Sequence, residues 1–176
     1  QFWWSNVLQS ETQTFLQNGA LPGYSPFREV QLFIDGSLAG VAWPFPIIFT
    51  GGVVPGLWRP IVGIDAFDLK EDEIDITPWL PLLCDGNAHT FEIRVSGLND
   101  NGNGTASLSE TTDDYWIVSG KIFLWLDTPG HITTGQGPHL ISPPPSLQVT
   151  SSLLKGQNGT NSTLLYQVQA QRTLSI

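Results

Sequence analysis

The chain has 176 residues, of which 40% are apolar, and this is enough for one large β-sandwich or for part of a two-domain protein. Sixteen acidic against seven basic residues give a formal charge of −9, which repels phosphate backbones and anionic lipids and so argues against nucleic-acid and membrane partners. No window approaches the roughly 20 apolar residues of a membrane span.

A β-hairpin is the first predicted element. Residues 28–34 read as a strand that ends at Asp35-Gly36, a favoured two-residue turn because both positions tolerate a positive φ. Residues 37–43 then return as its partner strand. The prolines from Trp43-Pro44-Phe45-Pro46 to Pro55-Gly56 predict a long ordered loop, the kind of segment that often carries a binding function on a sandwich.

One helical turn and further strands follow. Thr77 as N-cap and Pro78 as first helical residue predict a single turn, and nothing else in the chain indicates a helix. Residues 90–96 alternate apolar and polar side chains, as expected of a strand with one buried face. Residues 115–118 and 121–126 predict another strand pair around Ser119-Gly120.

The run Pro143-Pro144-Pro145 predicts a domain boundary. We therefore expect a jelly-roll sandwich over residues 1–142, with residues 143–176 forming a Pro-rich linker and the start of a following strand region. Alternation in this tail predicts strands that either begin a second sheet or pair with another chain. The fold class is thus all-β, a jelly-roll-type antiparallel sandwich that forms one part of a two-sandwich protein.

Several features predict a secreted protein. Charged residues make up only 13% of the chain, and three sequons predict N-glycosylation at Asn103, Asn158 and Asn161. The single cysteine, Cys84, predicts either a disulfide to a partner elsewhere or a free thiol. The chain opens on an aromatic cluster and contains no methionine, so we expect a proteolytically processed N-terminus.

Aromatic and charged side chains supply the candidate functional residues. Four tryptophans near predicted loops could either form a saccharide platform or lie in the core: Trp3, Trp4, Trp43 and Trp58. Three others are expected in the core: Trp79, Trp116 and Trp125. The candidate water-activating carboxylates, each near a predicted strand end, are Asp65, Asp68 and Asp100. Arg59 and Arg94 could stabilise an oxyanion or make structural ion pairs. The histidines and Cys84 lack metal-ligand spacing, so no cofactor is expected.

A run of motifs resembles the glycoamidase A family of plants and fungi over about residues 2–127. These motifs are Phe27-Arg28-Glu29-Val30, Asp35-Gly36, Trp43-Pro44-Phe45-Pro46, Thr50-Gly51-Gly52, Pro55-Gly56-Leu57-Trp58-Arg59-Pro60, Gly63-Ile64-Asp65-Ala66-Phe67-Asp68, Glu73-Ile74-Asp75-Ile76-Thr77-Pro78 and Lys121-Ile122-Phe123-Leu124-Trp125-Leu126-Asp127.

The resemblance implies a metal-free enzyme with an acidic optimum that hydrolyses the amide between an asparagine side chain and the first GlcNAc of an N-glycan. It also implies paired jelly rolls, a secreted or vacuolar location, and a precursor cleaved into chains, so that a second chain would be a partner beside the glycoprotein or glycopeptide substrate. Carried over to this sequence, Trp3, Trp4, Trp58 and Arg59 would line the glycan and peptide groove. Asp65 and Asp100 would supply catalytic carboxylates.

Two other interpretations stay open. Residues 75–78, followed by Gly86 and an alternating strand, also resemble sugar-binding jelly rolls attached to glycosidases, which predicts a non-catalytic carbohydrate-binding module. An assembly or structural module is the other, because open sheet edges template pairing with further chains. Gln1 stands where the family resemblance leads us to expect an acidic residue before Phe-Trp-Trp, which favours a chain that is incomplete as a catalyst.

Overall fold

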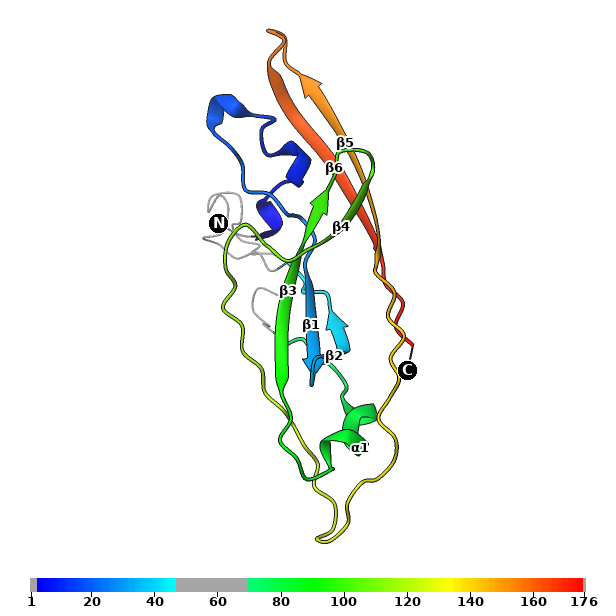
Figure 1. The fold of residues 1–176 in the computed structure, drawn as a ribbon. Helices are drawn as coiled ribbons and strands as arrows, with labels where there is room; N and C mark the ends of the chain where they lie inside the picture. The colour runs from blue at the N-terminus through cyan, green and yellow to red at the C-terminus, as the bar shows by residue number, and fades with distance from the viewer. Residues whose placement is uncertain (1–2, 47–69, 176) are drawn as a thin grey trace.

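The computed structural model describes residues 3–46 and 70–175, which form a curled antiparallel sheet (Figure 1). The strand order is β2-β1-β3-β4-β5-β6. The strands are β1 (Glu29–Ile34), β2 (Ser37–Ala42), β3 (Phe91–Asp100), β4 (Thr105–Ser109), β5 (Ser146–Lys155) and β6 (Asn161–Gln171). The predicted all-β, antiparallel class is confirmed, and the curl of the sheet is compatible with a jelly-roll-type sandwich.

The predicted hairpin is confirmed as β1 and β2. Its turn has φ values of 48° at Asp35 and 78° at Gly36, so both residues occupy the left-handed region that this tight turn needs. The register slips between Leu32 and Phe33, because Leu32 faces Gly40 while Phe33 faces Leu38. Ala39 is therefore the extra residue of a β-bulge, and every pair beyond it is displaced by one position.

Two apolar clusters hold the sheet together. One joins the N-terminal segment to the β3, β4 and β5 region through the buried residues Leu8, Leu98, Leu147 and Val149. The other buries Ile34, Ala39 and Trp79 beside the predicted helical turn, which consists of η5 (Thr77–Trp79) and α1 (Leu80–Leu83). Each fully buried large aliphatic side chain contributes roughly 1.5–3 kcal/mol.

The N-terminal segment contains three short 3₁₀ turns that the sequence did not indicate: η1 (Trp3–Ser5), η2 (Gln9–Glu11) and η3 (Leu16–Asn18). Long-range hydrogen bonds tie this segment to the sheet. The hydroxyl of Tyr166 on β6 donates to the carbonyl of Asn6 at 2.9 Å, and the Leu98 amide donates to the Tyr24 carbonyl at 3.0 Å. No helix in the described ranges is long and apolar enough to cross a membrane.

The C-terminal tail forms β5 and β6, a long hairpin that joins the same sheet through two residue pairs with β4. The tail was expected to start a second sheet or to pair with another chain, and the structure instead extends the first sheet with it (Figure 1). The division into domains at residue 143 stays a prediction.

The strand pair predicted at 115–118 and 121–126 is absent, because both segments run without ladder hydrogen bonds in the described structure. The expectation that Trp125 lies in the core was therefore wrong: its side chain is fully exposed. Trp79 is buried as expected, and Trp116 is half-buried. Local alternation identifies strand-forming residues, but burial of a strand also needs a neighbouring strand.

Candidate functional site

An open cavity of about 400 Å³ lies where the end of β2 meets the residues that follow β6. It is lined by Val41, Trp43, Arg172 and Leu174. Three of these side chains are apolar or aromatic and one is cationic. A mainly apolar surface with one well-placed polar group is typical of a site for a small ligand or for part of a larger one.

The carboxylate of Glu29 lies next to this cavity and is fully buried at the start of β1. Its Oε2 accepts a hydrogen bond of 3.1 Å from Nε1 of Trp43, and its Oε1 accepts one of 2.9 Å from Nε2 of Gln31. Nη2 of Arg172 lies 3.7 Å from Oε1. A buried carboxylate needs such partners, because desolvation without them costs several kcal/mol, which is comparable to the net free energy of folding of a small domain.

Arg172 connects the C-terminal segment to this carboxylate. Its side chain is only 8% exposed, and it also donates to the Pro143 carbonyl at 3.2 Å and to the Ser142 hydroxyl at 3.0 Å. A second cavity of about 470 Å³ lies between β4 and residues 142–145, and Arg172 contributes to its wall as well. The guanidinium thus stands between the two cavities with its charge paired.

Trp43 forms the aromatic wall of the first cavity and is 43% exposed. Its ring meets Phe27 edge-on with 5.3 Å between centroids, and its indole nitrogen is held by Glu29. Both contacts fix the ring orientation before any ligand arrives. An oriented, half-exposed indole offers an apolar face on which the face of a sugar ring can stack.

Trp3, a predicted groove residue, packs against a buried cation instead of lining this cavity. Its ring centroid lies 5.9 Å from that of Trp116, and the Arg28 guanidinium lies 5.7 Å from the Trp3 centroid. Arg28 is 2% exposed and donates to the carbonyls of Tyr24, Phe27 and Thr112. Burial lowers the pKa of Arg28 to about 10, and Asp113 partly opposes this shift. Trp4 is half-buried beside Trp3 in η1.

Asp100, a predicted catalytic carboxylate, is buried at the end of β3. Its Oδ1 accepts a hydrogen bond of 3.0 Å from the backbone amide of Ser10, which holds the start of η2. Its buried Oδ2 has no hydrogen-bond partner among the residues that the structure describes. Asp65, Trp58 and Arg59 lie outside the described residues, as does Asp68, so the structure does not place them relative to Asp100.

The predicted modification sites fall into different environments. Asn103 and Asn158 are exposed, and each accepts a hydrogen bond from the threonine hydroxyl of its own sequon. Asn161 is half-buried, and its Nδ2 donates to the Thr14 carbonyl at 2.7 Å. Cys84 is half-buried at the end of α1 and is a free thiol within this chain. Its predicted disulfide to another chain stays a prediction.

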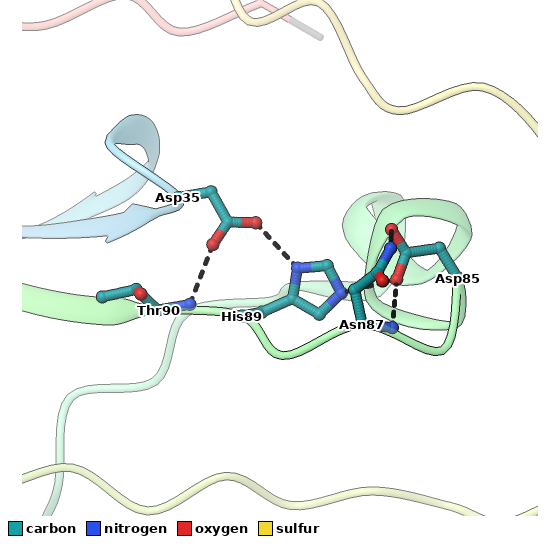
Figure 2. Close-up of polar contacts among 5 residues, drawn as sticks. All are labelled: Asp35, Asp85, Asn87, His89 and Thr90. Carbon is teal, nitrogen blue, oxygen red and sulfur yellow. Dashed lines mark hydrogen bonds and ion pairs between the residues drawn. The ribbon is translucent and has the colours of Figure 1, made fainter.

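A histidine lies between two carboxylates at the opposite end of the β1–β2 hairpin (Figure 2). Nδ1 of His89 is 2.7 Å from Oδ2 of Asp35, and Nε2 is 3.0 Å from Oδ1 of Asp85. These contacts raise the pKa of His89, with the Asp35 hydrogen bond as the largest cause. Both ring nitrogens are engaged, and within the described ranges no group of three or more His, Cys, Asp and Glu could hold a metal ion. The arrangement therefore ties the hairpin turn to the segment before β3.

Sequence reasoning missed Glu29, Trp43 and Arg172 as a group, although it weighed Trp43 as a sugar platform. A regular two-residue hairpin would pair Glu29 with Ala42. The bulge at Ala39 shifts the register so that Val30 faces Ala42. Continued by one more pair, this shifted register places Trp43 opposite Glu29. One signal in the sequence could have identified this site: Glu29 is an acidic residue inside a predicted strand, and acidic residues are rarely buried in a core.

Comparisons with known proteins agree on one family. The family model described as "Peptide N-acetyl-beta-D-glucosaminyl asparaginase amidase A" matches residues 1–138. The chain is 38% identical over 165 residues to "Peptide-N4-(N-acetyl-beta-glucosaminyl)asparagine amidase A" from Prunus dulcis, a match that covers 94% of this chain and 26% of the relative. The chain thus spans about a quarter of the length of this curated relative. No solved structure matches it significantly.

Proposed function

Because the chain belongs to the peptide N-acetyl-β-D-glucosaminyl asparaginase amidase A family, we propose that it forms part of a glycoamidase that hydrolyses the Asn–GlcNAc amide bond of N-glycoproteins or glycopeptides. The observation that carries this proposal is the 38% identity to the almond amidase, sustained over 94% of the chain. The chain covers 26% of that relative, so we propose that it acts with a second chain of the same cleaved precursor.

The proposed reaction needs two proton-transfer groups. A base activates water, which attacks the side-chain carbonyl carbon of the glycosylated asparagine; an acid protonates the departing nitrogen as the C–N bond breaks. The products are aspartate and a glycosylamine. We propose Asp65 and Asp100 as carboxylates that this chain supplies. In Asp100 the oxygen without a hydrogen-bond partner among the described residues is the buried Oδ2, because Oδ1 already accepts the Ser10 amide.

We propose the cavity at Trp43 as one glycan-binding subsite of this enzyme. The Trp43 face would stack on a sugar ring, and Arg172 would donate to a hydroxyl or acetamido oxygen at the cavity wall. Glu29 has no exposed surface and acts as a positioning residue, since it holds the Trp43 indole and lies beside the Arg172 guanidinium. Trp3, Trp4, Trp58 and Arg59 would extend the groove for the glycan and peptide.

The proposed location is extracellular or vacuolar. The exposed sequon residues Asn103 and Asn158 support it, because N-glycans are added only along the secretory route. Cys84 would then be free to form a disulfide with the second chain.

The test is a deglycosylation assay on the full-length protein containing this chain. Purified protein is incubated with an N-glycopeptide at acidic pH, and mass spectrometry follows conversion of the glycosylated asparagine to aspartate. Conversion supports the proposal, and the Trp43→Ala variant should raise the KM more than it lowers kcat. Glycan binding without any aspartate formation would instead identify a carbohydrate-binding module.

A further inference from the structure

Residues 115–126, called here the apolar arm, leave an unusually apolar surface in water. Ile117, Trp125 and Leu126 are 91%, 100% and 92% exposed, and Tyr115 and Phe123 are also largely exposed. Scattered exposed apolar residues are normal, but a continuous run of this kind marks an interaction surface. The arm descends beside β3 in Figure 1 as an extended segment without strand pairing.

The pattern of the arm is that of a strand buried on both faces. In Ile122-Phe123-Leu124-Trp125-Leu126 the side chains pointing to either side of an extended backbone are all apolar. A one-face strand such as β3, with Glu92 and Arg94 between its apolar residues, looks different. Continuous apolar runs of this length are typical of strands covered on both sides. Among the residues that the structure describes, the arm therefore has neither a paired strand nor a covering layer.

The arm lies next to the half of β3 that has no paired strand on its outer side among the described residues. β3 pairs with β1 along Phe91–Ser96, but on its other side β4 pairs only with residues 97–100. Gly120 of the arm comes so close to Ile93 of β3 that a Cβ atom there would lie 3.1 Å from the isoleucine side chain. Lys121 makes a solvent-exposed ion pair of 2.6 Å with Glu71. The arm is thus held beside the open half of β3 without completing a ladder within the described residues.

We propose that the apolar arm is the docking surface for the remaining part of the glycoamidase, a β-rich polypeptide that pairs a strand with residues 121–126 and covers both of their faces. This inference rests on the proposed function, because it takes the partner to be the rest of the longer protein. The chain spans only 26% of its almond relative, so a partner of sufficient size exists in that family. A few buried side chains, often aromatic, supply most of the binding free energy at such interfaces, and Phe123 and Trp125 would have this role here.

Charge argues against a second copy of this chain as the occupant. The chain carries a formal charge of −9, and acidic residues flank the arm at Asp113, Asp114 and Asp127. Two copies that met arm to arm would bring these like charges together. The arm itself contains one charged residue, Lys121, which is already paired, so an acidic ligand finds little to bind there.

Hydrogen exchange on the intact full-length protein tests the proposal. We expect backbone amides of residues 121–126 to exchange at least about a hundredfold more slowly than unprotected amides, because a paired strand protects them. Exchange at the unprotected rate would overturn the docking. A homodimer in which these amides are protected only at high protein concentration would overturn the choice of occupant.

A pair of variants in the same protein supplies the second measurement. Trp125→Ser should raise exchange in residues 121–126 and weaken co-purification of the two parts after limited proteolysis. Leu165→Ser, which removes a 54% exposed leucine on β6, should change neither. Equal behaviour of the two variants would contradict the proposal. Both readouts are independent of deglycosylation, so loss of the proposed activity and failure of the docking are separate results.

Discussion

The indole nitrogen of Trp43 donates a hydrogen bond of 3.1 Å to Oε2 of Glu29, and this bond joins the residue after β2 to the first residue of β1. The pairing depends on the bulge at Ala39, which shifts the hairpin register by one residue. One extra residue in a strand thus brings an aromatic wall and a buried carboxylate together. It also explains why the cavity contains a fixed indole.

Glu29→Gln should lower the free energy of unfolding by about 2–4 kcal/mol. Both carboxylate oxygens accept hydrogen bonds, from Trp43 and from Gln31, so an amide would place its NH₂ group against one of these donors. Arg172 would also lose its buried counter-charge. Denaturant unfolding, followed by tryptophan fluorescence, measures the change. Glu92→Gln, at an exposed acid, should stay within about 0.5 kcal/mol of the parent, and equal losses in both variants would contradict this role of Glu29.

Arg28→Met should also destabilise the protein by about 2–4 kcal/mol. Methionine keeps much of the apolar stem of Arg28 but removes the hydrogen bonds to the carbonyls of Phe27 and Thr112, and it leaves the Tyr24 carbonyl with the Leu98 amide as its donor. The change should appear as a lower midpoint of denaturant unfolding. The matched control is Arg94→Met, because Arg94 is exposed and, among the acids that the structure describes, pairs with Glu92 alone. Loss of its contact with the Phe33 ring, 4.2 Å from the centroid, should cost no more than about 1 kcal/mol. A parental midpoint for Arg28→Met would refute the structural role of this cation.

The sequence predicted the local elements of the sheet well because their signals are local. Asp35-Gly36 specifies its turn through backbone conformation, and the alternation predicted at the start of β3 matches the burial of residues 91–95, although residues 96–98 are all buried. The same reasoning failed for Trp125, because its burial depends on a partner strand that no local pattern can supply. Periodicity identifies a strand, whereas pairing is a property of the whole assembly.

The candidate site was less accessible from sequence for a different reason. Glu29 and Arg172 are far apart in the chain, and β3, β4 and β5 lie between β1 and β6 in the sheet, so the approach of the two side chains is a property of the curled sheet that no local pattern encodes. Asp100 was predicted as a strand-end carboxylate, which is where it lies, but its bond to the Ser10 amide depends on an N-terminal turn that the sequence did not indicate. The functional roles of Asp100, Trp3 and Trp4 stay predictions.

Glycans should be found at Asn103 and Asn158 and should be absent from Asn161. Nδ2 is the atom to which an N-glycan attaches, and in Asn161 this atom donates to the Thr14 carbonyl at 2.7 Å in a half-buried position. Glycopeptide mass spectrometry of protein from a eukaryotic secretory host would measure occupancy. Asn158→Gln should leave a glycan only at Asn103. Substantial occupancy of Asn161 in the folded protein would show that its contact with Thr14 does not form.

The His89 contacts should make stability depend on pH, and His89→Gln should remove the part of this dependence that the imidazole causes. Hydrogen bonding to Asp35, and secondarily to Asp85, raises the pKa of His89 above 6.5, so this contribution is complete below about pH 6.5 and is lost as pH rises through the folded-state value. The pKa of Asp35 is lowered, first by the Thr90 amide and then by His89. The Asn87 side chain is the largest cause of the lowered pKa of Asp85. Their contribution is present above about pH 4 and is lost in stronger acid.

The histidine contribution to stability is lost as the pH rises, whereas the carboxylate contribution is lost as the pH falls. Both are therefore present between about pH 4 and 6.5, where the protonated imidazole bridges two carboxylates. Melting temperatures of the parent and of His89→Gln, measured from pH 3 to about pH 9, should differ most inside this window and converge on both sides of it. His131→Gln is the control, because His131 is exposed and Asp127, at 3.5 Å, is its single acidic neighbour among the described residues. A difference between parent and His89→Gln that stayed constant with pH would mean that the imidazole acts through packing. The proposed acidic working environment would then gain no support from this contact.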